Sequence, residues 1–317
     1  MGRVDRRDAS GPRLAWPGTG VLARVRGTRI DVRLKDAGEN RFAVMVDGKG
    51  PKLIKTGPGS LSYELATGLS DGEHDVEIYK RTEVDVGVVQ FLGFVQPAVV
   101  TPPPHVRTIE FIGDSITAGY GIDVAADFNC PLAADEDAYS SYAAIAARRL
   151  KAAYALVAWS ARGMLRNWSG ETKDTMPELW ERTLGNESAH KWDFSTWTPD
   201  LVVVALGTND YAMGDPGEPF GSKYAAFLGK VRSRYPAAWV LCATSPMLTG
   251  ASRESLRTRV RGVVEGAKSK GDAKIAVVDF AEQINTDGNG CAGHPSSTTH
   301  RKMADQLVLS THSTIGW

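Results

Sequence analysis

Hydrophobic and polar positions alternate along the first third of the chain. Between residues 21 and 94, apolar side chains recur at every second position, most clearly in residues 30–34 and 42–47. This period is typical of strands with one buried face. Turn-forming residues separate the runs at Asp36-Ala37-Gly38, Asp47-Gly48, Gly57-Pro58-Gly59 and Asp71-Gly72. Short strands with no helical stretch between them predict an antiparallel, jelly-roll-like β-sandwich over residues 1–104.

A different pattern begins after the proline-rich connector at residues 101–104, which resists both helix and sheet. Continuous apolar runs replace the alternation, and such runs are typical of strands buried on both faces of a parallel sheet. They lie at residues 108–112, 155–159, 201–206, 239–243 and 275–278. Helical segments alternate with them at residues 140–152, 222–235, 253–270 and 299–309. This alternation predicts a doubly wound, three-layer α/β domain over residues 105–317.

Composition and charge narrow the class of protein. The chain has 317 residues, which suggests two domains and a core large enough to need neither metal nor disulfides for folding. Its 37 Lys and Arg residues balance 37 Asp and Glu residues, so it lacks the strongly basic character of nucleic-acid-binding domains. No apolar run approaches the roughly 18 residues of a membrane span. We therefore expect neither nucleic acid nor membrane as a partner.

The three cysteines are too few for a disulfide framework and do not have zinc-finger spacing. Cys242 lies in an apolar run and is predicted to be an inert core thiol, whereas a bridge between Cys130 and Cys291 stays open. The first residues lack the apolar segment of a secretory signal. By this criterion the protein is either cytoplasmic or has lost its signal peptide.

Residues that could take part in catalysis follow the predicted strands of the α/β domain. Ser115, Gly163 and Asn209 come after the first three strands, and His294 lies in a loop near the C-terminus. Ligands of such sheets bind at the carboxyl ends of the strands. Taken singly, Ser115 could equally be a helix cap and Asn209 a turn residue, whereas such a glycine is more often only a turn residue and a lone loop histidine is usually incidental.

Together these residues meet the requirements of acyl transfer. A serine hydroxyl is barely ionised near neutral pH, so Ser115 needs a base, and imidazole is suited to accept the proton. His294 is the candidate base, and His300 is a rival with a better claim to a structural role in the last helix. The amides of Ser115 and Gly163 and the side chain of Asn209 would form the oxyanion hole.

The blocks that carry these residues resemble those of the GDSL/SGNH hydrolases. They are Gly113-Asp114-Ser115, Gly163, Gly207-Thr208-Asn209-Asp210 and His294-Pro295. Nearly the whole chain is similar to carbohydrate esterase family 2, in which a β-sandwich precedes an SGNH domain. The stretches that carry this second resemblance are residues 42–48, 80–83, 113–121, 159–164 and 290–295.

The resemblance implies a serine acetylesterase that uses an acetyl-enzyme intermediate and neither cofactor nor metal. Its substrates would be acetylated polysaccharides such as xylan or glucomannan, including acetyl groups on 6-hydroxyls, and such polymers imply secretion. Many SGNH enzymes have an aspartate three residues before the histidine, where this chain has Cys291. The family resemblance therefore implies a Ser–His dyad oriented by a backbone carbonyl, with Asp287 or Asp279 left open as an acidic partner.

Other residues near the blocks are candidates for the substrate cleft. Aromatic faces suit the apolar C–H surface of sugar rings, although core packing is the better expectation for Trp159. The candidates are Asp114, Tyr120, Trp159, Arg162, Trp192 and Asp210. Two other functions stay open, namely a lipid or thioester hydrolase on the same scaffold and a carbohydrate-binding protein that has lost catalysis. Oligomeric state is not predicted.

Overall fold

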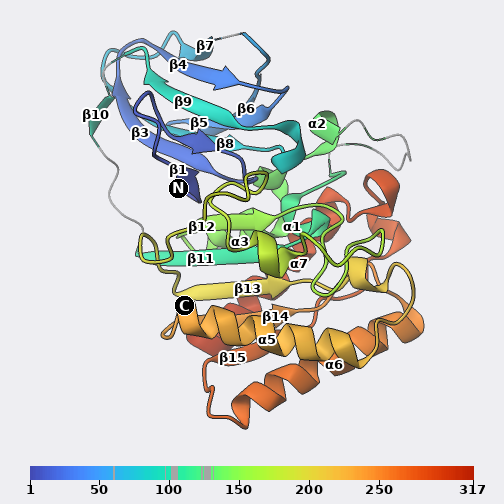
Figure 1. The fold of residues 1–317 in the computed structure, drawn as a ribbon. Helices are drawn as coiled ribbons and strands as arrows, with labels where there is room; N and C mark the ends of the chain where they lie inside the picture. Colours follow the sequence, from blue (N-terminus) through green and yellow to red (C-terminus); the bar gives the residue numbers. More distant parts are fainter. Residues whose placement is uncertain (60, 97, 101–105, 123, 125–129, 131) are drawn as a thin grey trace.

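A computed structural model describes the chain except residues 60, 97, 101–105, 123, 125–129 and 131. Two antiparallel sheets pack as a sandwich above a third, parallel sheet that carries helices on both faces (Figure 1). Both predicted fold classes are confirmed. The predicted connector and boundary, at residues 101–105, lie outside the described residues. No described helix is both long enough and apolar enough to cross a bilayer.

The sandwich consists of two five-stranded sheets whose recorded strand pairs are all antiparallel. The first has the order β1 (Val4–Asp5), β2 (Arg13–Leu14), β9 (Val89–Phe94), β4 (Arg29–Asp36) and β7 (Ser62–Thr67). The second has the order β10 (Ala98–Val100), β3 (Gly20–Arg26), β8 (Glu73–Lys80), β5 (Arg41–Val46) and β6 (Lys49–Lys55). Their facing side chains form an apolar core that includes Val32, Val44 and Ile78.

The alternation expected for residues 42–47 does not hold in β5. Phe42 and Val44 face the sandwich core, but Ala43 and Met45 are buried as well. Met45 and Tyr79 of β8 belong to the apolar cluster of the α/β domain, where the Tyr79 ring stacks on that of Tyr154. The second sheet is therefore covered on both faces, because the α/β domain packs against its outer side.

The parallel sheet has the order β12 (Ala152–Ala158), β11 (Arg107–Gly113), β13 (Leu201–Ala205), β14 (Trp239–Ala243) and β15 (Ile275–Val278). The direction of winding reverses between β11 and β13. At such a reversal the loops that follow the two strands diverge to opposite faces of the sheet and leave a crevice at its carboxyl edge. Ser115 follows β11 and Asn209 follows β13, so both lie at this reversal.

Four helices cover the two faces of the parallel sheet. The apolar clusters place α3 (Tyr142–Arg149) and α7 (Ser297–Ile315) on one face, and α5 (Glu218–Arg234) and α6 (Gly250–Lys268) on the other. The helix predicted to reach residue 152 ends earlier, because Lys151 has a left-handed φ of 53° and Ala152 begins β12. A 3₁₀ turn at Val84–Val86 lies between β8 and β9 of the sandwich. Short segments complete the α/β domain: α1 (Ser115–Ala118), α2 (Leu132–Asp135), α4 (Met176–Leu179), and 3₁₀ turns at Ala138–Ser140, Asn209–Tyr211, Asn285–Asp287 and Cys291–Gly293.

Trp16 joins the two domains through a shared core. It follows β2 of the sandwich, yet its side chain is fully buried in the apolar cluster of the α/β domain with Val84 and Trp180. Its Nε1 donates a hydrogen bond of 3.0 Å to the carbonyl of Thr183. A side chain of this size placed in the neighbouring domain couples the unfolding of the two domains.

Trp16→Ala is expected to lower the free energy of unfolding by about 3–5 kcal/mol, because it empties a large site in a shared core. Urea denaturation followed by circular dichroism measures the change. Trp168→Ala is the matched control, since that side chain is 63% exposed and its loss is expected to change stability by at most about 0.5 kcal/mol. Equal effects of the two substitutions would contradict the shared core.

Candidate active site

Ser115 begins α1 directly after β11, at the carboxyl edge of the sheet. Asp114 caps this turn by accepting a hydrogen bond of 3.0 Å from the amide of Ile116. Gly113 is required before it, because a Cβ there would lie 2.0 Å from Oγ1 of Thr117. The serine is thus held in a tight strand-to-helix turn.

His294 lies within hydrogen-bond distance of Ser115. Its Nε2 is 2.9 Å from the Oγ of Ser115, and its Nδ1 is 3.0 Å from the carbonyl oxygen of Cys291. A carbonyl only accepts hydrogen bonds, so Nδ1 carries the proton and Nε2 is free to accept the serine hydroxyl. Burial lowers the pKa of His294 below its usual 6.5, which favours the neutral base.

The turn that carries His294 is held from several sides. Cys291 forms a disulfide with Cys130, and its amide donates a hydrogen bond of 2.9 Å to the carbonyl of Gly121. The amide of Gly290 donates to the carbonyl of His294 at 2.8 Å. The bridge that the sequence left open is therefore present, and Cys242 is a buried free thiol whose pKa burial raises to about 12.

One cluster has the ligand types of a metal site. The sulfurs of Cys130 and Cys291 and a carboxylate oxygen of Asp135 lie within 4.8 Å of one another. Zinc and related metals bind cysteine as the thiolate. Because the two sulfurs are joined in the disulfide, neither is a thiolate, and the residues present do not fit a metal.

The other candidates for an acid or base make their hydrogen bonds elsewhere. The carboxylate of Asp287 pairs with Lys302 at 2.6 Å, and that of Asp279 binds Arg257 and Thr244. His300 is fully buried, and its Nδ1 accepts a hydrogen bond of 3.0 Å from the amide of Tyr142. Burial lowers the pKa of His300 to about 3. These contacts support a structural role for His300 and leave the Cys291 carbonyl as the recorded partner of His294 Nδ1.

The two further oxyanion candidates lie on adjacent turns of the same sheet edge. The side-chain nitrogen of Asn209 donates a hydrogen bond of 3.0 Å to the carbonyl of Arg162, which uses one of its two N–H groups. The amide of Gly163 donates to the side-chain oxygen of Asn167 at 3.2 Å. A Cβ on Gly163 would lie 1.9 Å from the carbonyl oxygen of Arg166, so only glycine fits this turn.

Two predicted cleft residues lie beneath the site instead of lining it. Asp210 is fully buried, and its carboxylate accepts the amides of Met164, Leu165 and Arg166 at 2.7–3.0 Å. Asp114 is also buried and caps α1, and burial raises its pKa to about 7. Neither residue lines a cleft as predicted, because both carboxylates accept hydrogen bonds from backbone amides in the interior of the turns.

Three other cleft candidates cluster near the site. The ring of Tyr120 lies 4.7 Å from that of His294, edge to face. Trp159 is buried, as its position at the end of an apolar strand suggested, and its Nε1 donates to a carboxylate oxygen of Asp85 at 2.6 Å. The guanidinium of Arg162 lies 4.6 Å above the Trp159 ring. Tyr120 and Arg162 are half-buried, so parts of both face solvent beside the candidate active site.

Comparisons with known proteins match both parts of this arrangement. The family model Carbohydrate esterase 2 N-terminal matches residues 1–104, and the GDSL-like Lipase/Acylhydrolase family model matches residues 111–302. A solved family two carbohydrate esterase from Clostridium thermocellum, in complex with cellohexaose, superposes with a TM-score of 0.96 at 37% identity. The match covers 100% of this chain and 98% of that one. The chain belongs to carbohydrate esterase family 2.

Curated relatives place this family 2 chain among carboxylic ester hydrolases. Cellulase/esterase CelE of Acetivibrio thermocellus is 37% identical over 320 residues, which cover all of this chain but 39% of CelE. The chain therefore spans about two-fifths of that relative. An acetylxylan esterase / glucomannan deacetylase of Cellvibrio japonicus is 29% identical over 333 residues, covering all of this chain and 88% of that protein.

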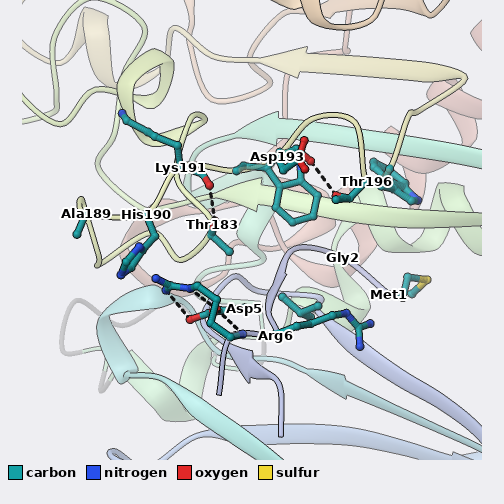
Figure 2. A pocket seen from close by; sticks show the side chains of 14 residues that line it. Met1, Gly2, Asp5, Arg6, Thr183, Ala189, His190, Lys191, Asp193 and Thr196 are labelled. Carbon is teal, nitrogen blue, oxygen red and sulfur yellow. Dashed lines mark hydrogen bonds and ion pairs between the residues drawn. The ribbon is translucent and has the colours of Figure 1, made fainter. Parts of the chain in front are cut away.

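Trp192, also predicted to line the cleft, lies elsewhere in this family 2 esterase. It precedes β13, and residues before a parallel strand lie at the sheet edge opposite to those that follow one. Its ring lies 5.2 Å from the guanidinium carbon of Arg3. With His190 and Lys191 it lines a cavity of about 810 Å³ between the N-terminal strand and this loop (Figure 2). The prediction for Trp192 is corrected accordingly.

Trp168 was missed from the sequence, although it is an exposed aromatic side chain next to the Gly163 turn. Its amide donates a hydrogen bond of 2.9 Å to the carbonyl of Ala161, and its side chain is 63% exposed. The available signal was a large aromatic residue in a polar, non-helical stretch, Arg166-Asn167-Trp168-Ser169-Gly170. An exposed tryptophan here offers a flat apolar face to a sugar ring.

Asp287→Ala is expected to keep the rate of ester hydrolysis within about threefold of wild type, because its carboxylate pairs with the exposed amine of Lys302 and not with His294, and a pair with one exposed partner contributes little. Initial rates with 4-nitrophenyl acetate measure the effect. Lys302→Ala, which removes the other half of the same pair, is the control and is expected to behave alike. A loss of several orders of magnitude in Asp287→Ala would show an acidic third member of the site.

Proposed function

We propose that this chain is a serine acetylesterase that removes O-acetyl groups from plant polysaccharides, namely acetylated xylan or glucomannan, including 6-O positions. The observation that carries the proposal is the 2.9 Å contact between Ser115 Oγ and His294 Nε2, with Nδ1 bound to the Cys291 carbonyl. The names of the Cellvibrio japonicus relatives and the cellohexaose complex of the Clostridium thermocellum esterase support a polysaccharide substrate.

In the first half of the reaction, Ser115 Oγ attacks the acetyl carbonyl while His294 Nε2 takes its proton. The negative charge that develops on the carbonyl oxygen is stabilised by the amide of Ser115, by the free N–H of Asn209 and by the amide of Gly163. The Gly163 N–H exchanges the neutral side-chain oxygen of Asn167 for this charged acceptor, which binds it more strongly. When the tetrahedral intermediate collapses, His294 donates the proton to the departing sugar hydroxyl, and the acetyl group stays on Ser115.

In the second half, water attacks the acetyl-enzyme. His294 takes a proton from this water, the same oxyanion donors stabilise the second intermediate, and the proton returns to Ser115 as acetate leaves. A neutral carbonyl stabilises the imidazolium of His294 less than a carboxylate would. The imidazolium is therefore less favoured than it would be beside a carboxylate, and the resting histidine stays neutral.

The same proposal places the enzyme outside the cell. Acetylated cell-wall polymers lie there, and the Cys130–Cys291 disulfide is of a kind that persists in oxidising compartments. The disulfide supports extracellular action independently of the substrate, because it rests on the chemistry of the chain alone.

Acetate release from acetylated xylan and acetylated glucomannan, by wild type and Ser115→Ala side by side, tests the function. Wild type is expected to release acetate, and the substitution to lower the rate by at least about 10³-fold, because no nucleophile remains. Release that survives in Ser115→Ala would exclude this nucleophile. No release from either polymer by wild type would overturn the polysaccharide assignment, and a preference for long acyl chains would favour a lipid hydrolase.

The pH dependence follows from the lowered pKa of His294. The base works only when neutral, and its pKa lies below 6.5, so kcat/KM is expected to fall on acidification with a midpoint below pH 6.5. A kcat/KM profile for 4-nitrophenyl acetate from about pH 4 to about pH 9 measures it. An acidic limb centred at or above pH 6.5 would show that a neighbouring charge, and not burial, dominates the histidine.

A further inference from the structure

The turn that carries Gly163 has a backbone conformation that is unfavourable by itself. Ala161 has a left-handed φ of 62°, which is costly for a residue with a Cβ, and Gly163 sits where no side chain fits. Such a conformation persists only when surrounding groups hold it. The amide of Gly163 is one of the proposed oxyanion donors, so its position depends on those groups.

Besides the hydrogen bond of the Gly163 amide to Asn167, carboxylates hold the turn from both sides, one from the same domain and one from the sandwich. Asp210 binds three successive amides on the C-terminal side of Gly163. On the N-terminal side, the carboxylate of Glu83 accepts both the amide of Ser160, at 2.5 Å, and its hydroxyl. Two residues further on, Asp85 accepts the indole N–H of Trp159 at 2.6 Å.

The segment that carries Glu83 is itself anchored by buried groups. The Nζ of Lys80 donates to the carbonyls of Thr82 and Glu83 at 2.7 and 2.8 Å, and the amide of Glu83 donates to Glu136 at 2.6 Å. Lys80, Glu83 and Glu136 are all fully buried. Burial raises the pKa of Glu83 and raises that of Glu136 to about 7. A buried carboxyl group lowers the stability of the fold unless it is hydrogen-bonded. The hydrogen bonds of Lys80, Glu83 and Glu136 therefore favour a single position of the Glu83 segment.

We propose that Glu83 is a positioning residue of the esterase, through which the β-sandwich sets the Gly163 amide and thereby the strength of oxyanion stabilisation. This inference rests on the proposed function. It gives the sandwich a role in the chemical step, because the groups that shape one side of the oxyanion turn come from residues that precede the α/β domain.

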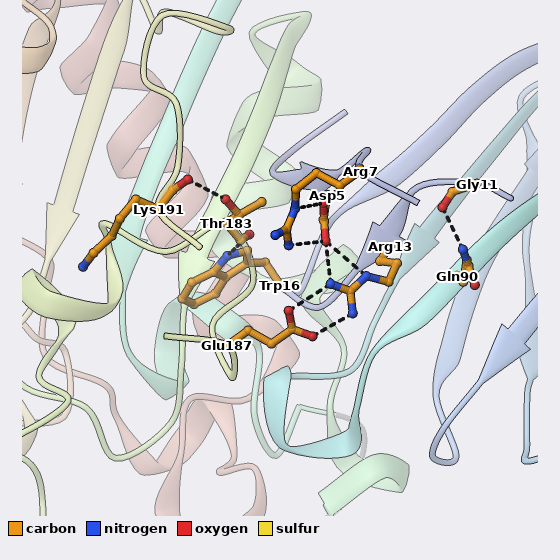
Figure 3. Close-up of polar contacts among 9 residues, drawn as sticks. All are labelled: Asp5, Arg7, Gly11, Arg13, Trp16, Gln90, Thr183, Glu187 and Lys191. Atoms are coloured by element: carbon orange, nitrogen blue, oxygen red, sulfur yellow. Dashed lines mark hydrogen bonds and ion pairs between the residues drawn. The ribbon is translucent and has the colours of Figure 1, made fainter. Parts of the chain in front are cut away.

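A second polar contact between the sandwich and the α/β domain provides the control. The guanidinium of Arg13, in β2, binds Glu187 through two hydrogen bonds of 2.7 and 2.9 Å and also binds Asp5 (Figure 3). Glu187 lies in the loop before β13, and the hydrogen bonds that the structure gives its carboxylate are to Arg13. Glu187→Ala therefore removes a carboxylate from the same domain interface without touching the oxyanion turn.

The test compares kcat and KM for 4-nitrophenyl acetate and acetylated xylan in Glu83→Ala and Glu187→Ala. Glu83→Ala is expected to lower kcat on the order of 10²-fold with KM within about twofold, since a displaced donor acts only in the transition state. Glu187→Ala is expected to keep kcat within about twofold. Glu83→Gln is expected to recover at least about tenfold, because its amide can accept the Ser160 N–H and donate to the hydroxyl.

Ser160→Ala keeps the inference testable if Glu83→Ala does not fold. It removes the hydroxyl half of the contact from within the turn, and a loss of about fivefold in kcat with unchanged KM is expected. Three results would overturn the inference: unchanged kcat in Glu83→Ala or Ser160→Ala, an equal loss in Glu187→Ala, or no recovery in Glu83→Gln. A wild type that hydrolyses 4-nitrophenyl acetate but not the polymers would refute the proposed substrate and leave this test intact.

Discussion

The hydrogen bond from His294 Nδ1 to the carbonyl of Cys291 determines which ring nitrogen faces Ser115. Many related hydrolases orient the histidine with a carboxylate side chain, which can adjust its own rotamer. A backbone carbonyl has no such freedom, so its direction depends on how the whole turn is held. The disulfide to Cys130 and the amide contact with Gly121 hold this turn. The position of the base therefore depends on the covalent and hydrogen-bonded surroundings of one peptide group.

The proposed oxyanion side of the site depends on a comparable constraint. Around Gly163 the backbone adopts conformations that local preference disfavours, and carboxylates satisfy its amides from two directions, with Asp210 below and Glu83 from the sandwich. Both carboxylates are buried, where a hydrogen bond is strong and an unsatisfied group is costly. The turn of the proposed oxyanion donor is thus held by buried carboxylates.

The packing of the sandwich explains why two folds act as one unit. Its second sheet is buried on both faces, and Trp16 reaches into the core of the neighbouring domain. An interface built from apolar cores and buried carboxylates differs from the polar, mobile contacts usual between tethered domains. Rigid contact of this kind allows groups on the sandwich to define a turn at the edge of the parallel sheet.

The sequence alone determined the elements and the order of the chemistry. Periods of two and runs of buried strands are local patterns, so both fold classes could be predicted. The same patterns put Ser115, Gly163 and Asn209 after strands, and the roles assigned to them and to His294 are the proposal made above. Tertiary structure decided what each carboxylate and tryptophan does. Asp210 binds inward, Trp192 lies at the opposite edge, and Glu83 meets Ser160 across 77 residues of sequence. Burial and long-range hydrogen bonding depend on how elements pack, and no local pattern encodes that packing.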